Sequence, residues 1–128
     1  MTDPAHATLV RNAAVLGLVV LELAQQDAKW GVQDHPYDAP DGYWASAGGE
    51  LEGRARWSLQ EDGPSWAAIL MEEVGEAFQA ESPEALKSEL VQVAAVAIQW
   101  VAAIERRNAP KEAPMPTPAA PALTYEAL

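Results

Sequence analysis

The sequence has no cysteine and few positive charges, with 8 Lys and Arg residues against 19 Asp and Glu residues in a chain of 128. The lack of cysteine excludes disulfides, thiolate metal ligands and cysteine nucleophiles, so stability has to come from packing or oligomerisation. The formal net charge of −11 argues against nucleic acid and against an anionic membrane surface as the main partner, because Lys and Arg make those contacts. A phosphorylated small molecule remains compatible with this charge if a divalent cation lies between ligand and protein.

No targeting or membrane-spanning segment is evident. The apolar stretch 13–24 contains Glu22 and is far shorter than the roughly 20 apolar residues that span a bilayer. We therefore expect a cytoplasmic protein with no membrane partner. The length predicts a single domain, which we place at 1–108. The segment 109–128 holds five of the ten prolines, which predicts an extended or disordered Pro/Ala-rich tail.

Three segments have the apolar periodicity of helices. The first runs from about Thr8 to Lys29 and is apolar around most of its circumference, which indicates burial on more than one side. The second follows possible capping residues at 62–65 and continues to about Ala80. The third begins at Ser82–Glu84, a cap followed by proline and an acid, and extends to Arg107. Because only two residues separate the second and third helices, we expect an antiparallel hairpin.

The stretch from Gly31 to Gly63 is rich in Gly and Pro and predicts a long loop with at most a short helix at 50–60. Disordered segments are seldom so aromatic, so we expect this loop to fold over another part of the protein. Its aromatic residues are Trp30 at its edge, Tyr37, Tyr43, Trp44 and Trp57.

The fold class is therefore all-α: a helical bundle of about four helices with a long aromatic-rich loop, completed by oligomerisation. Roughly 75 helical residues are few for a self-sufficient core. From Val93 to Ile104 the third helix has Gln99 as its only polar residue, and this apolar surface needs another subunit. A homo-oligomer, either a dimer or a tetramer, is the expected assembly.

Acidic residues gather on the two helices of the predicted hairpin. On a helical wheel Glu73 falls inside the apolar arc of its helix, Glu76 lies just past the edge and Glu72 lies further round. A carboxylate in a helix interface is costly unless it is paired or binds a metal. No Lys or Arg lies within 65–80, so ion pairs along the helix do not explain the cluster.

The third helix completes the predicted site. Glu89 and Gln92 are three residues apart and share a face, and the hairpin would bring them against Glu73 and Glu76. Carboxylate and amide oxygens without His or Cys suit Mg²⁺ or Mn²⁺ rather than zinc. Because both histidines lie off these helices, iron is disfavoured. The alternative is an acidic surface exposed to solvent. Two observations argue against it: Glu73 points inward on the helical wheel, and Glu89 and Gln92 repeat the three-residue spacing of Glu73 and Glu76 on the next helix.

Glu72-Glu73-x-x-Glu76, followed by a spacer and Glu89-x-x-Gln92, resembles the signature of the MazG-like all-α nucleoside triphosphate pyrophosphatases, relatives of the dimeric dUTPases. That signature is Glu-Glu-x-x-Glu followed by Glu-x-x-Asp, so this chain departs from it at Gln92. Residues 29–36 also resemble a Lys-Trp-Gly-x-Gln-x-His stretch of small bacterial and phage members. The resemblance covers about 25–107.

The resemblance implies a Mg²⁺-dependent hydrolase that converts a nucleoside triphosphate to a monophosphate and pyrophosphate, clearing unwanted nucleotides. It implies that Glu72 holds a second metal or orients the attacking water, so that Glu72 and Glu73 are the catalytic residues. A bound cation activates water, so no protein nucleophile is required. The implied metal ligands are Glu73, Glu76, Glu89 and Gln92.

Other residues are candidates for substrate contact, each with a simpler alternative. Trp30 can stack on a base or anchor the end of its helix. His35 can touch phosphate or base, or stabilise a turn. The cations able to reach a triphosphate are Lys29, Arg54, Arg56 and Lys87, for each of which ordinary exposure to solvent is the alternative.

Gln92 keeps a second class of function open. Its amide oxygen can coordinate Mg²⁺ but brings no negative charge, which would weaken metal binding, change the number of metals or mark a non-catalytic relative. In that second interpretation the chain is a catalytically impaired helical oligomer that binds nucleotide, metal or protein as a sensor or interaction module. A third interpretation is a helical assembly protein without a small-molecule site.

Overall fold

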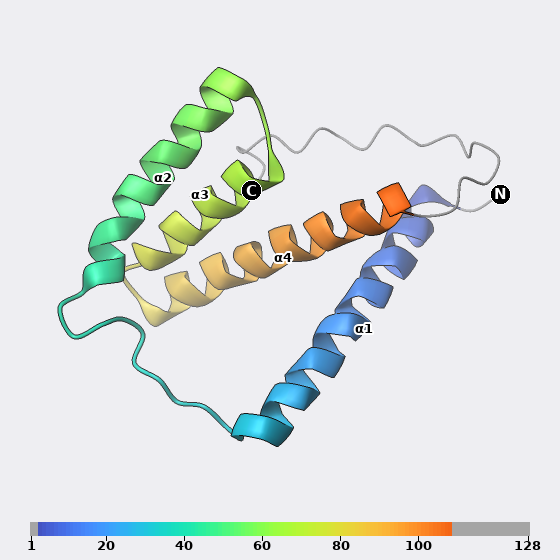
Figure 1. The fold of residues 1–128 in the computed structure, drawn as a ribbon, viewed down its shortest axis with the longest axis horizontal. Helices are drawn as coiled ribbons and strands as arrows, with labels where there is room; N and C mark the ends of the chain where they lie inside the picture. Colours follow the sequence, from blue (N-terminus) through green and yellow to red (C-terminus); the bar gives the residue numbers. More distant parts are fainter. Residues whose placement is uncertain (1–2, 109–128) are drawn as a thin grey trace. The chain divides into compact units, whose positions relative to one another are not determined.

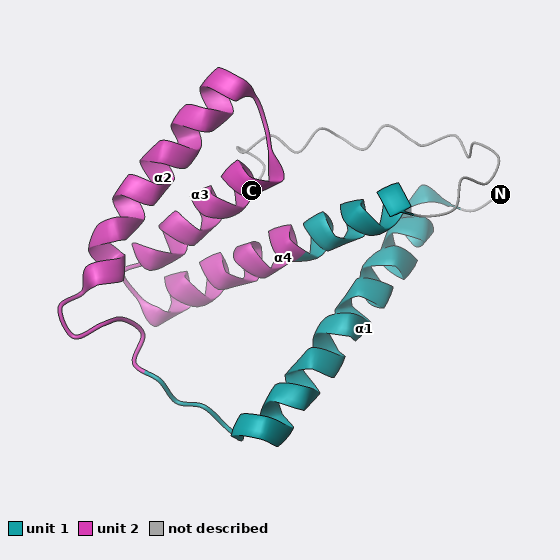
Figure 2. Ribbon diagram, viewed as in Figure 1, with its two compact units in different colours: residues 1–35, 98–118 teal, residues 36–97, 119–128 magenta. Residues whose placement is uncertain are grey.

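The computed structural model describes residues 3–108, and these form four helices and no strand (Figure 1). The predicted all-α class with about four helices is confirmed for this part of the chain. The described residues divide into two compact units (Figure 2). Within the described residues the first unit contains 3–35 together with 98–108, and the second contains 36–97. The predicted tail at 109–128 lies outside the described residues.

Helix α1 spans Pro4–Trp30 and so begins about four residues earlier than the sequence pattern predicts. The Asp3 side chain accepts a hydrogen bond from the backbone N–H of Ala5 at 3.2 Å. Proline suits the first turn of a helix, where its missing N–H has no partner to lose. Gly31, with φ 70°, ends the helix in a backbone conformation that glycine adopts easily.

The apolar surface of α1 is mostly exposed. Its one buried residue is Val15. The prediction that α1 is buried on more than one side is therefore wrong for a single chain. By length and composition α1 and the last helix, α4 (Pro83–Asn108), each qualify as membrane-spanning helices, but core helices and signal sequences pass the same test. The exposed large apolar residues of α1 are Leu9, Val10, Leu16, Leu18, Val19, Val20, Leu21 and Leu23.

Helix α2 spans Tyr43–Asp62 and corrects the prediction of a long loop from Gly31 to Gly63. Only 31–42 is non-helical between α1 and α2. Glycines at 48, 49 and 53 lower the helix propensity of this segment by roughly 1 kcal/mol each, which is why the sequence pattern predicts no more than a short helix. Tertiary packing of α2 on the next helix, α3 (Trp66–Phe78), outweighs this cost.

Asp38 fixes the beginning of α2. Its carboxylate accepts hydrogen bonds from the backbone N–H groups of Ala39, Trp44 and Ala45 at 2.7, 3.0 and 2.9 Å. The bond from Ala45 is the largest cause of a lowered Asp38 pKa, because it stabilises the charged carboxylate. The cap residue Gly42 has no side chain to offer, so an aspartate four residues earlier satisfies these amides instead.

Helices α3 and α4 begin at the caps that the sequence predicts. α3 spans Trp66–Phe78, and the Ser65 hydroxyl accepts a hydrogen bond from the Ala68 N–H at 3.1 Å. α4 spans Pro83–Asn108, and the Ser82 hydroxyl accepts one from the Ala85 N–H, also at 3.1 Å. Between them, 79–82 reverse the direction of the chain, so that α3 and the first half of α4 form the predicted antiparallel hairpin (Figure 1).

The second unit has a small core to which three helices contribute. Its buried apolar residues are Leu59 of α2, Ala68 and Ile69 of α3, and Val96 of α4, with Trp66 and Leu70 packed against them. α2 and α3 also approach closely at two glycines, Gly48 and Gly75. This packing holds α2 against the face of α3 that carries the acidic residues.

Candidate metal centre

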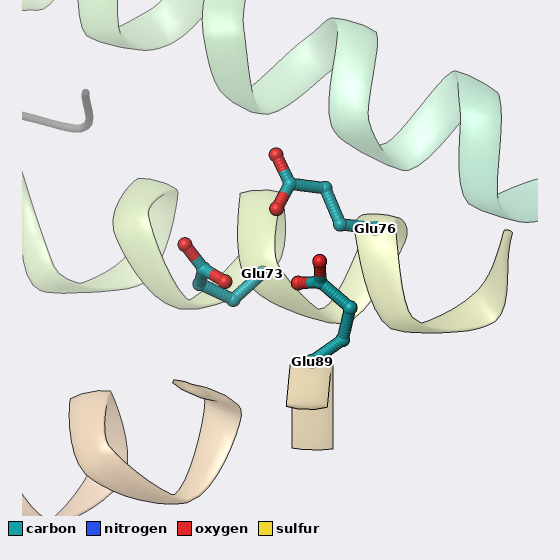
Figure 3. Close-up of side chains that lie close together, drawn as sticks. All are labelled: Glu73, Glu76 and Glu89. Carbon is teal, nitrogen blue, oxygen red and sulfur yellow. The ribbon is translucent and has the colours of Figure 1, made fainter. Parts of the chain in front are cut away.

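Three of the predicted metal ligands lie together in the second unit (Figure 3). Glu73 and Glu76 of α3 and Glu89 of α4 each offer one carboxylate oxygen, and these atoms lie within 4.8 Å of one another. Glu73 and Glu76 share a helix face because they are three residues apart. The reversal at 79–82 directs Glu89 of α4 toward them. We call Glu72, Glu73, Glu76 and Glu89 the carboxylate cluster.

Two members of the carboxylate cluster, Glu72 and Glu73, are buried, and the other two, Glu76 and Glu89, are half-buried. Glu73 is 1% exposed and Glu72 is 2% exposed. One carboxylate oxygen each of Glu72, Glu73 and Glu89 is buried without a hydrogen bond. Buried carboxylates are costly unless a cation or hydrogen-bond donors satisfy them. Converging carboxylate oxygens without His or Cys fit a hard divalent cation such as Mg²⁺ or Mn²⁺.

Glu72 is more buried than its angle on the helical wheel predicts. The wheel considers α3 alone and places Glu72 furthest from the apolar arc. In the folded chain α2 covers this side of α3, and Arg56 Nε of α2 lies 3.7 Å from Glu72 Oε2. Glu72 therefore faces α2, whereas Glu73 contributes to the group with Glu89 of α4.

Helix α2 adds two side chains to the site. Arg56 forms an ion pair with Glu52 at 3.0 Å, and its Nη2 also lies 3.7 Å from Glu76 Oε1. Glu52 is not among the residues that the sequence singles out, because a Glu and an Arg four residues apart normally form an exposed helix pair. Arg56 is among the cations that the sequence predicts to reach a triphosphate, and its spacing from Gly48 and Glu52 along one face of α2 is the signal that could have pointed to Glu52.

Burial and mutual repulsion raise the pKa values of the acidic residues on α3. Burial raises the pKa of Glu76 to about 7, and the charges of Glu73 and Glu89 add to the effect. The pKa of Glu73 is raised by burial and then by the charge of Glu89. Burial also raises the pKa of Glu72, although Arg56 opposes this shift. A bound cation would relieve this repulsion and favour the charged carboxylates.

Comparison with known proteins leaves the function of this site open. No family model, curated protein or solved structure matches the chain. The carboxylate cluster and the charged residues around it are therefore the basis for inferring its chemistry.

The remaining predicted residues of the second unit lie at its surface. Gln92 is half-buried on α4, and Arg54 pairs with Glu50 at 2.9 Å on the exposed side of α2. Their proposed roles, as a metal ligand and as a phosphate contact, stay predictions, as does that of Lys87. An open hollow on α4 is lined by Glu84, Lys87, Ser88, Val91, Gln92 and Ala95.

The three predicted substrate contacts from the start of the chain belong to the first unit. The Lys29 ammonium lies 4.7 Å from the centre of the Trp30 ring, and Trp30 is exposed at the end of α1. The His35 Nε2 is 2.8 Å from the side-chain oxygen of Gln33. The carboxylate cluster belongs to the second unit, so contact of these residues with a substrate stays a prediction.

Proposed function

We propose that the chain is a Mg²⁺-dependent nucleoside triphosphate pyrophosphohydrolase of the MazG-like type, which yields a monophosphate and pyrophosphate and clears unwanted nucleotides. The observation that carries the proposal is the convergence of Glu73, Glu76 and Glu89, with buried carboxylate oxygens that have no hydrogen-bond partner. The motif formed by these residues supplies the reaction class through its resemblance to that family.

Each acidic residue has a role in this proposal. Glu73, Glu76 and Glu89 would hold Mg²⁺ or Mn²⁺, and Gln92 would add an uncharged oxygen. The bound cation would polarise the phosphoryl oxygens and lower the pKa of water. Glu72, which precedes Glu73 on α3 and is buried, would orient the attacking water and accept its proton, a task that suits a carboxylate with a raised pKa. The phosphoanhydride bond between the α- and β-phosphates would break.

A measurement of pyrophosphate release tests the proposal. The substrates are a panel of ribo- and deoxyribonucleoside triphosphates, supplied with Mg²⁺ or Mn²⁺. We expect Glu73→Gln to lower turnover by about 100-fold, because it removes a charged ligand from a buried site. Glu61→Gln, an exposed acid at the end of α2, serves as the matched control and should retain activity. A panel that remains intact, or full activity of Glu73→Gln, would contradict the proposal.

A second candidate function follows from Gln92. With an amide where the family signature has a carboxylate, the cluster would carry one negative charge fewer toward a metal. The chain would then bind nucleotide or metal as a sensor or interaction module without turnover. Calorimetry with Mg²⁺ and nucleotide discriminates, since heat of binding without pyrophosphate release supports this function and measurable turnover excludes it.

We also propose that a second copy of the chain covers the exposed apolar surface of α1, forming a dimer or tetramer. Contiguous apolar patches of this kind are rare on monomers. A bilayer is the other partner to consider, because α1 is long and apolar enough to cross one. We favour a second copy of the chain because Glu22 lies within the apolar stretch and a charged side chain in the hydrocarbon core is costly.

Sedimentation of the full chain tests the assembly. We expect an oligomer for the wild type and a shift to monomer for Leu16→Glu, which places a charge on the exposed face of α1. His6→Glu, near the exposed start of α1, adds an equal charge outside the apolar run and should leave the oligomer intact. A monomeric wild type, or partition of the wild type into vesicles, would overturn this proposal.

A further inference from the structure

Arg56 lies at the solvent side of the carboxylate cluster. Half of its side chain is exposed (51%), whereas the side chains of Glu72 and Glu76 are 3% and 28% exposed. A ligand approaching Glu72 and Glu76 from solvent would therefore meet the guanidinium of Arg56. In a chain with so few cations, this position makes Arg56 the residue to consider for contact with an anionic ligand.

The contacts of Arg56 with its three carboxylates are unequal. The ion pair with Glu52, on the same helix, is 3.0 Å long. The distances to Glu72 and Glu76 on α3 are both 3.7 Å, beyond ordinary hydrogen-bond length. Glu52 thus anchors the guanidinium, and the two acids of α3 attract it through charge alone.

We propose that Arg56 is the resident counter-ion of the carboxylate cluster, that a divalent cation displaces it from Glu72 and Glu76, and that the released guanidinium binds a phosphate of the incoming ligand. This inference rests on the proposed function, since it assumes a cation at Glu73, Glu76 and Glu89. In this proposal Arg56 competes with the metal for Glu72 and Glu76, and it also recognises a ligand with a phosphoanhydride bond.

Electrostatics accounts for both parts of the exchange. A cation held by Glu76 neutralises that carboxylate and repels the guanidinium, which weakens the two long contacts. Glu52 keeps the side chain beside the site through the shorter ion pair. A phosphate of the ligand then replaces the two carboxylates as the negatively charged partner of Arg56. Two of its oxygens can accept hydrogen bonds from the planar guanidinium at the same time.

The experiment compares Arg56→Gln with Arg106→Gln in the full chain. Arg106 is exposed near the end of α4, so its variant loses the same charge away from the site. Calorimetry first measures Mg²⁺ alone and then a non-hydrolysable nucleoside triphosphate at saturating Mg²⁺. We expect Arg56→Gln to bind Mg²⁺ about tenfold more tightly and the triphosphate about tenfold more weakly. Arg106→Gln should change both affinities less than about twofold.

The proposal predicts that Arg56→Gln changes the affinities for Mg²⁺ and for the triphosphate in opposite directions. Arg56→Lys keeps the charge but not the fork geometry, so it should bind Mg²⁺ like the wild type and the triphosphate more weakly. If Arg56→Gln weakens both affinities, Arg56 is structural and the inference is wrong. It is equally wrong if Arg106→Gln reproduces the changes. If the wild type and Arg56→Gln bind Mg²⁺ and the triphosphate equally well, only this inference fails. If the wild type binds no Mg²⁺, both this inference and the proposed function fail.

Discussion

Gly48 of α2 and Gly75 of α3 meet backbone to backbone. A Cβ atom on Gly48 would lie 2.9 Å from the carbonyl oxygen of Gly75, and one on Gly75 would lie 2.8 Å from the carbonyl oxygen of Gly48. The missing side chains allow the two helices to approach closely. This approach brings Arg56 of α2, paired with Glu52, to Glu72 and Glu76 of α3.

The glycine contact predicts a large difference between two substitutions on α2. Gly48→Ala should lower the free energy of unfolding by about 1–3 kcal/mol, because its Cβ would also lie 2.9 Å from the Phe78 Cβ and both helices would have to move. Chemical denaturation followed by circular dichroism measures the change.

Gly53→Ala is the control on the same helix. A Cβ there meets nothing within 4 Å, so alanine should stabilise the helix by roughly 0.5–1 kcal/mol through its higher propensity. Equal effects of the two substitutions would show that the close approach at Gly48 is not a feature of the folded protein in solution.

Glu73→Gln should stabilise the metal-free protein while removing its response to metal. The substitution neutralises a buried carboxylate that has an oxygen without a hydrogen bond and is close to other acids, so we expect the Tm to rise by about 3 °C. Mg²⁺ should raise the Tm of the wild type, since a ligand that binds only the folded state stabilises it, and should leave that of Glu73→Gln unchanged. Thermal melts with and without Mg²⁺ measure both effects, and an equal Mg²⁺ response would contradict the assignment.

The raised pKa of Glu76 predicts that the metal-free protein loses stability as the pH rises. Between the ordinary value of 4.5 and the folded value of about 7, the folded state binds more protons than the unfolded state. The stabilising contribution is therefore complete below pH 4.5 and is lost as the pH rises through 7. The raised pKa values of Glu72 and Glu73 act in the same direction.

Denaturation of the wild type and Glu76→Gln at pH 5, 6 and 7.5 tests this dependence. The wild type should fall further below the variant at pH 7.5 than at pH 5, because the amide introduced by the substitution cannot ionise. Saturating Mg²⁺ should reduce the difference at pH 7.5. A difference that stays constant with pH would show that the Glu76 carboxyl does not change its protonation in this range.

Asp38 should be required for the stability of α2. Asp38→Ala leaves the backbone N–H groups of Ala39, Trp44 and Ala45 without their acceptor, so the helix signal in circular dichroism and the Tm should both fall. Asp34→Ala, an exposed acid in the same loop, should leave both unchanged. Because the pKa of Asp38 is lowered, its contribution is present above pH 3.8 and is lost as the pH falls below that value.

Local patterns were sufficient for the hairpin and for the inward position of Glu73. The residues that begin α3 and α4 interact with backbone groups only a few positions away, so their place in the sequence is enough to predict where each helix starts. They are Ser65, Ser82 and Pro83. The wheel angle of Glu73 depends only on its own helix, and it is buried as that angle indicates. The same reasoning failed for Glu72, because its burial depends on α2, a helix distant from it in the sequence.

Sequence patterns were sufficient to predict the all-α class, the beginnings of α3 and α4, and the spacing that places Glu73 and Glu76 on one helix face. These features depend on interactions between residues three or four positions apart. The sequence patterns did not predict that the glycine-rich segment from Tyr43 is a helix, or that Glu52 and Arg56 lie at the carboxylate cluster. Both features depend on the contact of Gly48 with Gly75, where close packing between two helices overrides the low helix propensity of α2.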